Sequence, residues 1–517
     1  MTSTGAHDEG PADAPADTRA RPTRAELFLL LLGSALVVAH AWHLDDAFVY
    51  FRYVDNWVLW GHGPVHNPGE WVEGYSSPAW LLVLAALRGA GLEYWDITRS
   101  VGVLAWGTAW WLLVRARRAA SPVDDAPGAA PPNLALALLA GHYAVASYFT
   151  SGTESPLVLV VACAFVLLVH ERGSRAAQVL AGLAPLVRPE LLLPLALFVA
   201  LDWRRSGRWL VVPITFALVT NLAWLVFRVW AYADVVPNTF HLKDRAHLDW
   251  GLAYLHDALL PYGGYVAVGA AVALAALGPR GLRAPRWTLL ALAGIVTVYV
   301  VRIGGDGRHF RYLLFPYALV AGATLGAAPA WLRGGARSGL ATIALGLLVA
   351  LSWPRQLDRH PLLDGVEETR VGVIRDAWFH RAQPELRAVG PHPAPDALEG
   401  AVGVTGWCHE AWASPHAVWI HKDGLTEPIL AHSDAVPFRP AHFDTTLPAA
   451  EEIARVRATY GQRGAFRRAV EAGDAAPWVE ANLEALDAIE ARAFNGHRFG
   501  ENLGLALSRV PTVRLGR

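Results

Sequence analysis

The sequence predicts an all-α polytopic membrane protein with a C-terminal α/β domain outside the membrane. Of its 517 residues, 54% are hydrophobic and only 17% are charged, whereas an average soluble domain has about 25% charged residues. The hydrophobic residues gather in long runs, as membrane-spanning helices require. From residue 354 onward, charged residues, Pro and Gly become frequent and the long apolar runs stop. We therefore predict a membrane domain over 25–353 and an extracytoplasmic soluble domain over 354–517.

Charge and cysteine content exclude some classes of protein. The net charge is −1, so the chain has no broad basic field and we expect no nucleic-acid partner. Cys163 lies in a hydrophobic run and Cys408 in a distant polar region, so a disulfide between them is not expected. The spacing of cysteine and histidine does not match a zinc site.

The first residues of the chain are predicted to lie in the cytoplasm. Residues 1–24 are rich in Ala, Pro, Asp and Thr and are predicted to be disordered. The first apolar run, 27–42, follows three arginines and ends in His-Leu-Asp-Asp, without the small residues of a cleavage site. We interpret it as a retained first helix and not as a signal peptide.

Arginine clusters orient the apolar runs, because Lys and Arg are in excess in cytoplasmic loops. If the first helix exits at Asp45, the run 98–115 must cross inward to leave Arg115 inside. The run 77–92 then cannot cross, and we interpret it as a juxtamembrane helix in a first external loop, 44–97. The other arginine clusters then fall inside, which gives about eleven spans in the inner membrane. The predicted spans are 27–42, 98–115, 133–150, 155–170, 176–187, 191–202, 209–230, 252–277, 286–302, 312–332 and 338–353.

Two of these runs, 176–187 and 191–202, are short for a crossing, which needs about 20 residues. They flank Arg188-Pro189-Glu190. They could be two crossings or one broken or re-entrant hairpin, and irregular backbone at that depth must line a cavity or be buried in protein.

The predicted topology gathers unusual polar residues on the outer side. Asp45 and Asp46 are the first candidates for chemistry, since adjacent carboxylates at a membrane exit are costly unless something uses them. Arg and Lys are the usual partners of phosphate, and a carboxylate can act as general base for a sugar hydroxyl. The pattern favours an anionic, lipid-linked substrate. The accompanying candidates are Arg52, Asn56, Asn67, Glu73, Tyr75, Glu154, Arg188, Glu190, Asn238, Lys243, Asp306, Arg308, His309 and Arg311.

Structural roles compete with these interpretations. Asp45 and Asp46 could cap the juxtamembrane helix. Glu154 could be a charge placed near the start of the next helix. Arg188 could be an interfacial residue that snorkels toward the headgroups.

A series of short motifs extends from about residue 40 to about residue 445. They are Asp45-Asp46, Arg52 to Asn56, Asn67 to Glu70, Glu73 to Pro78, Thr153 to Pro156, Arg188 to Glu190, Pro237 to Lys243, Gly304 to Asp306, Arg311-Tyr312, Gly424 to Pro428 and Arg439 to Phe443. As a set they resemble the GT-C class of integral-membrane glycosyltransferases, which take a sugar from a polyprenyl-phosphate donor. The likeness is strongest to the bacterial branch that includes the terminal β-arabinofuranosyltransferase of mycobacterial-type cell walls.

The resemblance implies that the first-loop aspartate deprotonates the acceptor hydroxyl. That hydroxyl then attacks the anomeric carbon with inversion, and the lipid phosphate leaves. Asp45 is the first candidate for this base and Asp46 the second. By the same resemblance, the phosphate is expected to meet Arg188, Lys243 and Arg311.

The resemblance also leaves room for a cofactor. Glu154 and Asp306 could orient the sugar or the acceptor, or bind a divalent cation, which some members of the class use and others do not. The external domain, which includes His442, could bind the acceptor glycan. The chain departs from the family pattern at Arg308 and His309, where Arg308 could instead pair with Asp306.

The main hypothesis is a glycosyltransferase that moves a sugar, with arabinofuranose as the first candidate, to a cell-envelope glycan. The same chemistry could act on a protein or lipid acceptor. A transporter for a lipid-linked sugar would show inverted repeats and midplane charges, whereas the polar motifs here gather at one face. A structural membrane partner with an external recognition domain is the remaining alternative.

Overall fold

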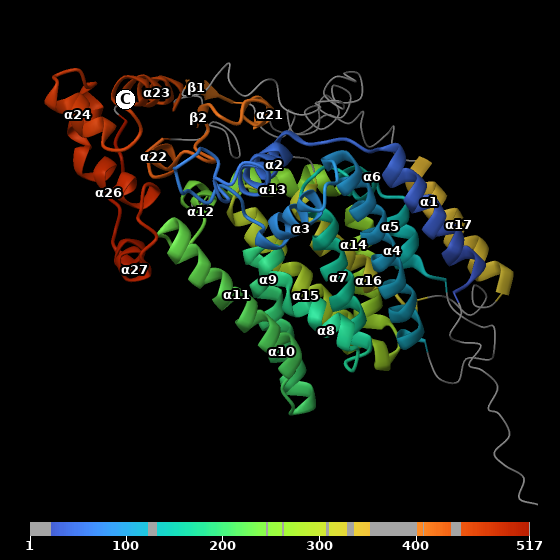
Figure 1. Ribbon diagram of the computed structural model, residues 1–517. Helices are drawn as coiled ribbons and strands as arrows, with labels where there is room; N and C mark the ends of the chain where they lie inside the picture. Colours follow the sequence, from blue (N-terminus) through green and yellow to red (C-terminus); the bar gives the residue numbers. More distant parts are fainter. Residues whose placement is uncertain are drawn as a thin grey trace, which may run out of the picture.

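The computed structural model is mostly helical, as the sequence predicts (Figure 1). The segments that follow residue 400 lie at one end of the helical bundle, where α21 packs on α2, α22 on α12 and α27 on α11. The structure describes residues 22–121, 132–243, 247–260, 263–306, 310–327, 335–351, 401–406, 408–435 and 446–515.

The first part of the chain forms helices interrupted by short loops. The helices are α1 Arg24–Ala39, α2 Asp45–Val58, α3 Pro78–Gly89, α4 Tyr94–Ala120, α5 Leu134–Ala140, α6 Tyr143–Tyr148, α7 Ser155–His170, α8 Arg175–Gly182, α9 Ala184–Val187, α10 Leu192–Ser206, α11 Val211–Tyr232, α12 Asn238–Lys243, α13 Leu248–Leu259, α14 Gly264–Leu277, α15 Arg280–Arg302, α16 Leu314–Gly322 and α17 Gly335–Leu351, with 3₁₀ turns η2 Pro189–Leu191 and η3 Arg311–Leu313.

Among the described residues, three helices are long and apolar enough to cross a bilayer. These are α4, α11 and α15, and the bent pair α13 and α14 would add a fourth if it forms one span. Helix α11 exposes Leu218, Val219 and Leu222 by more than half of their surface. Such a row is costly in water but suits lipid. The membrane character of the chain is thus supported, while the count of about eleven spans stays a prediction.

Three predicted spans are interrupted: 133–150, 176–187 and 252–277. The run 176–187 divides at Leu183 into α8 and α9. The run 133–150 divides into α5 and α6 at Gly141, which lies close to α17: a Cβ there would lie 2.3 Å from the carbonyl oxygen of Gly346. The run 252–277 divides into α13 and α14, next to Pro261 in the sequence, and proline is a poor residue for a helix interior.

The run 77–92 forms the short helix α3, and its juxtamembrane placement stays a prediction. It begins at Pro78, with the Ser77 hydroxyl accepting from the amide of Trp80, which is a favourable start for a helix. Its 12 residues span ~18 Å, less than the ~30 Å of a hydrocarbon core.

The C-terminal region packs helices around two parallel strands. Its elements are β1 Val402–Thr405, α21 Cys408–Ala413, β2 Val418–His421, α22 Pro428–Ala431, α23 Leu447–Tyr460, α24 Ala465–Glu471, α25 Pro477–Ala481, α26 Leu483–Ala493 and α27 Phe499–Leu507. The strand expected at Val402 is present, and the helical stretches expected near 451–468 and 478–494 correspond to α23 with α24 and α25 with α26. Ile420, Ile453 and Phe466 lie in its core.

A buried ionic triad joins this region to the loop between α2 and α3. The Arg457 guanidinium lies 3.1 Å from Glu70 and 3.1 Å from Glu427, and all three side chains are only 1% exposed. Two carboxylates thus share one guanidinium away from water. Burial raises the pKa of Glu427 to about 7, and the pull of Arg457 offsets this only in part.

We expect Arg457→Met to lower the free energy of unfolding by about 3–5 kcal/mol, because it leaves buried carboxylates without their counter-charge. The measurement is thermal unfolding in detergent. The matched control is Arg455→Met, whose guanidinium is 41% exposed beside Glu452, so the loss should stay below about 1 kcal/mol. Equal losses in both variants would contradict a special role for the triad.

The triad also predicts a pH dependence. The pKa of Glu427 rises from its ordinary 4.5 to about 7 in the folded chain. The unfolded state therefore releases its proton first, and this group's contribution to stability, complete below about pH 4.5, is lost as pH rises toward 7. We expect Glu427→Gln to show a smaller loss of unfolding temperature over that window than the wild type. A larger loss in the variant would oppose this assignment.

Candidate active site

Asp45 and Asp46 are the first two residues of α2 and lie in its first turn. Carboxylates are stabilised there by the partial positive charge of a helix N-terminus. Asp45 and Arg52 are seven residues apart, two turns of helix, and so lie on one face of α2. That face packs against α21.

Asp45 and Arg52 hold opposite ends of α21. The Asp45 carboxylate accepts hydrogen bonds from the backbone amides of Cys408 at 3.1 Å and His409 at 3.3 Å. The Arg52 guanidinium donates to the carbonyl oxygens of Ser414 at 3.0 Å, Ala417 at 2.7 Å and Ala411. Because a helix is positive at its N-terminus and negative at its C-terminus, the two charges on α2 match the two ends of α21.

Asp45 also contacts an imidazole. Nδ1 of His409 lies 3.2 Å from Oδ1 of Asp45, and the side chains are 25% and 9% exposed. Burial would raise the pKa of the Asp45 carboxyl, but the hydrogen bonds from His409 and from the Cys408 amide outweigh it and lower the pKa. The carboxylate is therefore ionised at neutral pH. Sequence reasoning missed His409, since nothing local links it to an aspartate 364 positions away.

Asp46 belongs to a second group, the two-arginine cluster, defined as Asp46, Glu154, Arg188, Glu190, Asp306 and Arg311. Its first half is centred on Arg311, which donates to Asp46 at 2.8 Å and to both oxygens of Asp306 at 2.6 and 3.1 Å. The Asp46 side chain is 36% exposed, so this half has access to solvent.

The second half of the cluster is centred on Arg188. This residue has extended backbone between α9 and η2, and its guanidinium pairs with Glu154 at 2.9 Å and with Glu190. The Tyr312 ring joins the halves: the guanidinium carbon of Arg188 lies 4.0 Å from its centre and that of Arg311 5.4 Å.

The six residues of the two-arginine cluster include four carboxylates and two guanidiniums. The sequence-based hypothesis places a divalent cation at Glu154 and Asp306. In the described part of the chain, however, the side chains whose ligand atoms gather within 4.8 Å in a group of three lie elsewhere, at Asp234, His241 and His432. The expected cation thus stays a prediction.

Other predicted residues hold the loop between α2 and α3 in place. Asn56 donates to the carbonyls of Val65 and His66 at 2.8 and 3.0 Å. Asn67 accepts from the amide of Trp419 in β2 at 2.9 Å. These bonds fix the loop against the C-terminal region.

A third group lies around α11 and α12. Glu73 pairs with Arg228, and the hydroxyls of Tyr75 and Tyr232 are 2.8 Å apart. Asn238 donates to the carbonyls of Gly424 and Leu425 at 2.9 and 3.1 Å. Substrate binding by these residues stays a prediction. Lys243 ends α12, and Arg308, His309 and His442 lie outside the described residues.

Comparison with known proteins agrees with the motifs. The chain is 30% identical over 319 residues to the terminal beta-(1->2)-arabinofuranosyltransferase of Mycobacterium tuberculosis, which covers 53% of this chain and 51% of that protein. It is 29% identical over 331 residues to the protein of the same name from Corynebacterium glutamicum, 53% of this chain and 46% of that protein. The chain therefore spans about half the length of the curated relatives it matches. No family model matches it, and no solved structure does.

The hold on α21 yields a local prediction. We expect Arg52→Gln to speed amide hydrogen exchange in α21 by ~30-fold, because lost charge-assisted hydrogen bonds are worth about 1.5–3 kcal/mol. The amides of α23 and α26 should not change. The control is Arg172→Gln, which removes a half-exposed pair with Asp202. Unchanged exchange in α21 would show that the hydrogen bonds from Arg52 do not stabilise this helix.

Proposed function

We propose that this chain is a GT-C-type glycosyltransferase that moves arabinofuranose from a polyprenyl-phosphate donor to a cell-envelope glycan. The similarity to two terminal beta-(1->2)-arabinofuranosyltransferases supports the class of reaction and the sugar. The observation that carries the proposal is the position of Asp45. Its ionised carboxylate contacts the His409 imidazole, and the adjacent residue on α2, Asp46, pairs with Arg311 of the two-arginine cluster.

In the proposed reaction, Asp45 acts with His409 as the proton acceptor. A carboxylate in contact with an imidazole is a common arrangement for proton transfer near neutral pH. The acceptor hydroxyl gives up its proton as its oxygen attacks the anomeric carbon. The bond from that carbon to the phosphate oxygen breaks, polyprenyl phosphate leaves, and the configuration inverts. Asp46 is the second candidate for this base.

Arg311 and Arg188 are the proposed partners of the donor phosphate, with Lys243 a third. Arginine suits this role because its planar guanidinium binds phosphate through two hydrogen bonds. Each guanidinium is held by carboxylates before substrate arrives, so it is already oriented. Glu154 and Asp306 would act by holding the arginines in place.

The proposal includes a topology. The N-terminus lies in the cytoplasm, about eleven helices cross the inner membrane, and the first loop and the region after residue 354 lie outside. Asp45, Arg188 and Arg311 would then face the outer side, where a lipid-linked sugar is presented.

Sugar transfer tests the proposal. We expect membranes that express the wild type to transfer from one donor in a panel of polyprenyl-phosphate arabinofuranose, mannose and glucose, with glycan acceptors. Asp45→Asn should lose ~10²–10⁴-fold in rate, the usual contribution of a general base. The asparagine oxygen still accepts from α21, so the protein level should hold. The control is Asp202→Asn, which lies beside Arg172 and outside the proposed site.

Asp46→Asn separates the two aspartates. If Asp46 positions Arg311, this variant should raise KM for the donor more than it lowers kcat. Full transfer by Asp45→Asn together with loss in Asp46→Asn would move the base to Asp46. Transfer to protein or lipid, or movement of the donor without transfer, would favour the alternative acceptors or the transporter.

A further inference from the structure

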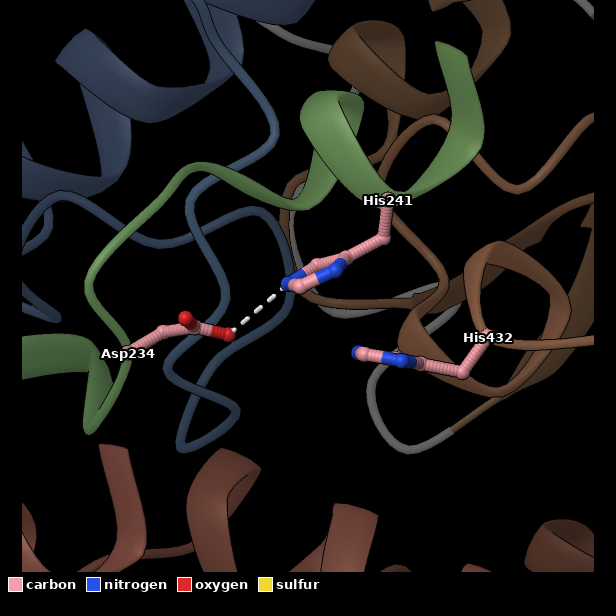
Figure 2. A group of neighbouring side chains, drawn as sticks. All are labelled: Asp234, His241 and His432. Carbon is pink, nitrogen blue, oxygen red and sulfur yellow. Dashed lines mark hydrogen bonds and ion pairs between the residues drawn. The ribbon is translucent and has the colours of Figure 1, made fainter. Parts of the chain in front are cut away.

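Another group of titratable side chains lies apart from Asp45 and Asp46, at the contact (seam) between α12 and α22. Asp234 lies between α11 and α12, His241 is in α12 and His432 follows α22. Figure 2 shows the two imidazole rings side by side, extending toward the side on which Asp234 lies. The ring centres are 4.1 Å apart.

The separations suit a small metal ion. One ligand atom from each of the three residues lies within 4.8 Å of the others. Zinc binds His nitrogen at about 2.0–2.1 Å and carboxylate oxygen at about 2.0–2.2 Å with tetrahedral angles, which places its ligands roughly 3.4 Å apart. Nε2 of His241 and Oδ2 of Asp234 are already 3.1 Å apart. The ligand atom of His432 lies within 4.8 Å of the other two, so the three would have to move closer together around an ion.

The ligands are partly prepared for this role. The other carboxylate oxygen of Asp234 accepts from the backbone amides of Val235 at 2.6 Å and Val236 at 3.2 Å, which fixes its orientation. The His432 side chain forms no hydrogen bond with any residue that the structure describes. His432 thus lies with a free ring nitrogen beside a second imidazole and a carboxylate, which are ligand types that zinc binds.

One charge opposes the ion. Arg492 lies 3.4 Å from Oδ2 of Asp234. Its guanidinium is also held by the carbonyls of Leu505 and Ser508 at 2.6 and 2.5 Å, so it remains in place without the aspartate. If Oδ2 is shared with a metal ion, the guanidinium keeps these two carbonyl partners.

The group borders a cleft that would admit the ion and a water molecule. The cleft holds about 380 Å³ of empty space, open solvent included, and both Asp234 and His432 line it. Glu73, Asn238 and Arg492 line the same cleft.

We propose that Asp234, His241 and His432 bind a zinc ion, with water from the cleft as the fourth ligand. Two imidazole nitrogens and one carboxylate favour zinc over calcium or magnesium, which prefer oxygen ligands alone. The ion joins the loop after α11 to the C-terminal region and so fixes the seam between them. This inference does not depend on the proposed transfer reaction.

Metal content and thermal unfolding test the site. The full chain is purified in detergent through a tag without histidine, stripped with chelator and titrated with zinc alone. We expect about one bound zinc per chain, a zinc-dependent rise in unfolding temperature, and a ~100-fold weaker affinity in His432→Asn and His241→Asn. The matched control is His256→Asn, whose ring contacts the Tyr265 hydroxyl outside the group, and it should bind zinc like the wild type.

Each outcome decides the question. The unfolding temperatures of all variants in chelator are compared first, so that loss of fold is separated from loss of ligand. No zinc bound by the wild type, or equal affinity in the wild type and both histidine variants, overturns the site. Zinc that stabilises the wild type and the control but neither variant supports it.

Discussion

The match between two charges on α2 and the two ends of α21 is the interaction on which the rest of the candidate site depends. Asp45 accepts from the amides that begin α21, and Arg52 donates to carbonyls at and beyond its end. These contacts place His409 beside Asp45. The imidazole and the carboxylate therefore meet only while the C-terminal region is docked, which makes the proposed base a product of docking.

The loop between α2 and α3 carries buried carboxylates that have cationic partners. Glu70 shares Arg457 with Glu427 of the C-terminal region, and Glu73 pairs with Arg228. Buried pairs add little net stability, because removing the charges from water costs about as much as their attraction returns. They do penalise any other arrangement, since a displaced partner leaves an unpaired charge. The position of this loop is thus specified by what misdocking would cost.

Interrupted helices position the two-arginine cluster. Arg188 lies where α9 ends and η2 begins, and Arg311 begins η3 ahead of α16. Side chains at such breaks can point into the bundle without the crowding of a helical turn. Irregular backbone within a membrane domain is stable where its polar groups are satisfied by protein, and here both arginines are held by carboxylates.

Local pattern in the sequence was enough to predict a mostly helical protein with membrane-spanning helices, a separate short helix near Pro78, the strand at Val402, and the motifs that Asp45, Arg188 and Arg311 belong to. Those features follow from hydrophobic runs, prolines, caps and charge, which act over a few residues. The tertiary structure alone decided that His409 meets Asp45, that Arg311 pairs with Asp306, and that the run 133–150 divides at Gly141. Each of these depends on segments that packing brings together. The sequence does not show, for example, that the backbone of Gly346 would lie 2.3 Å from a Cβ placed at Gly141.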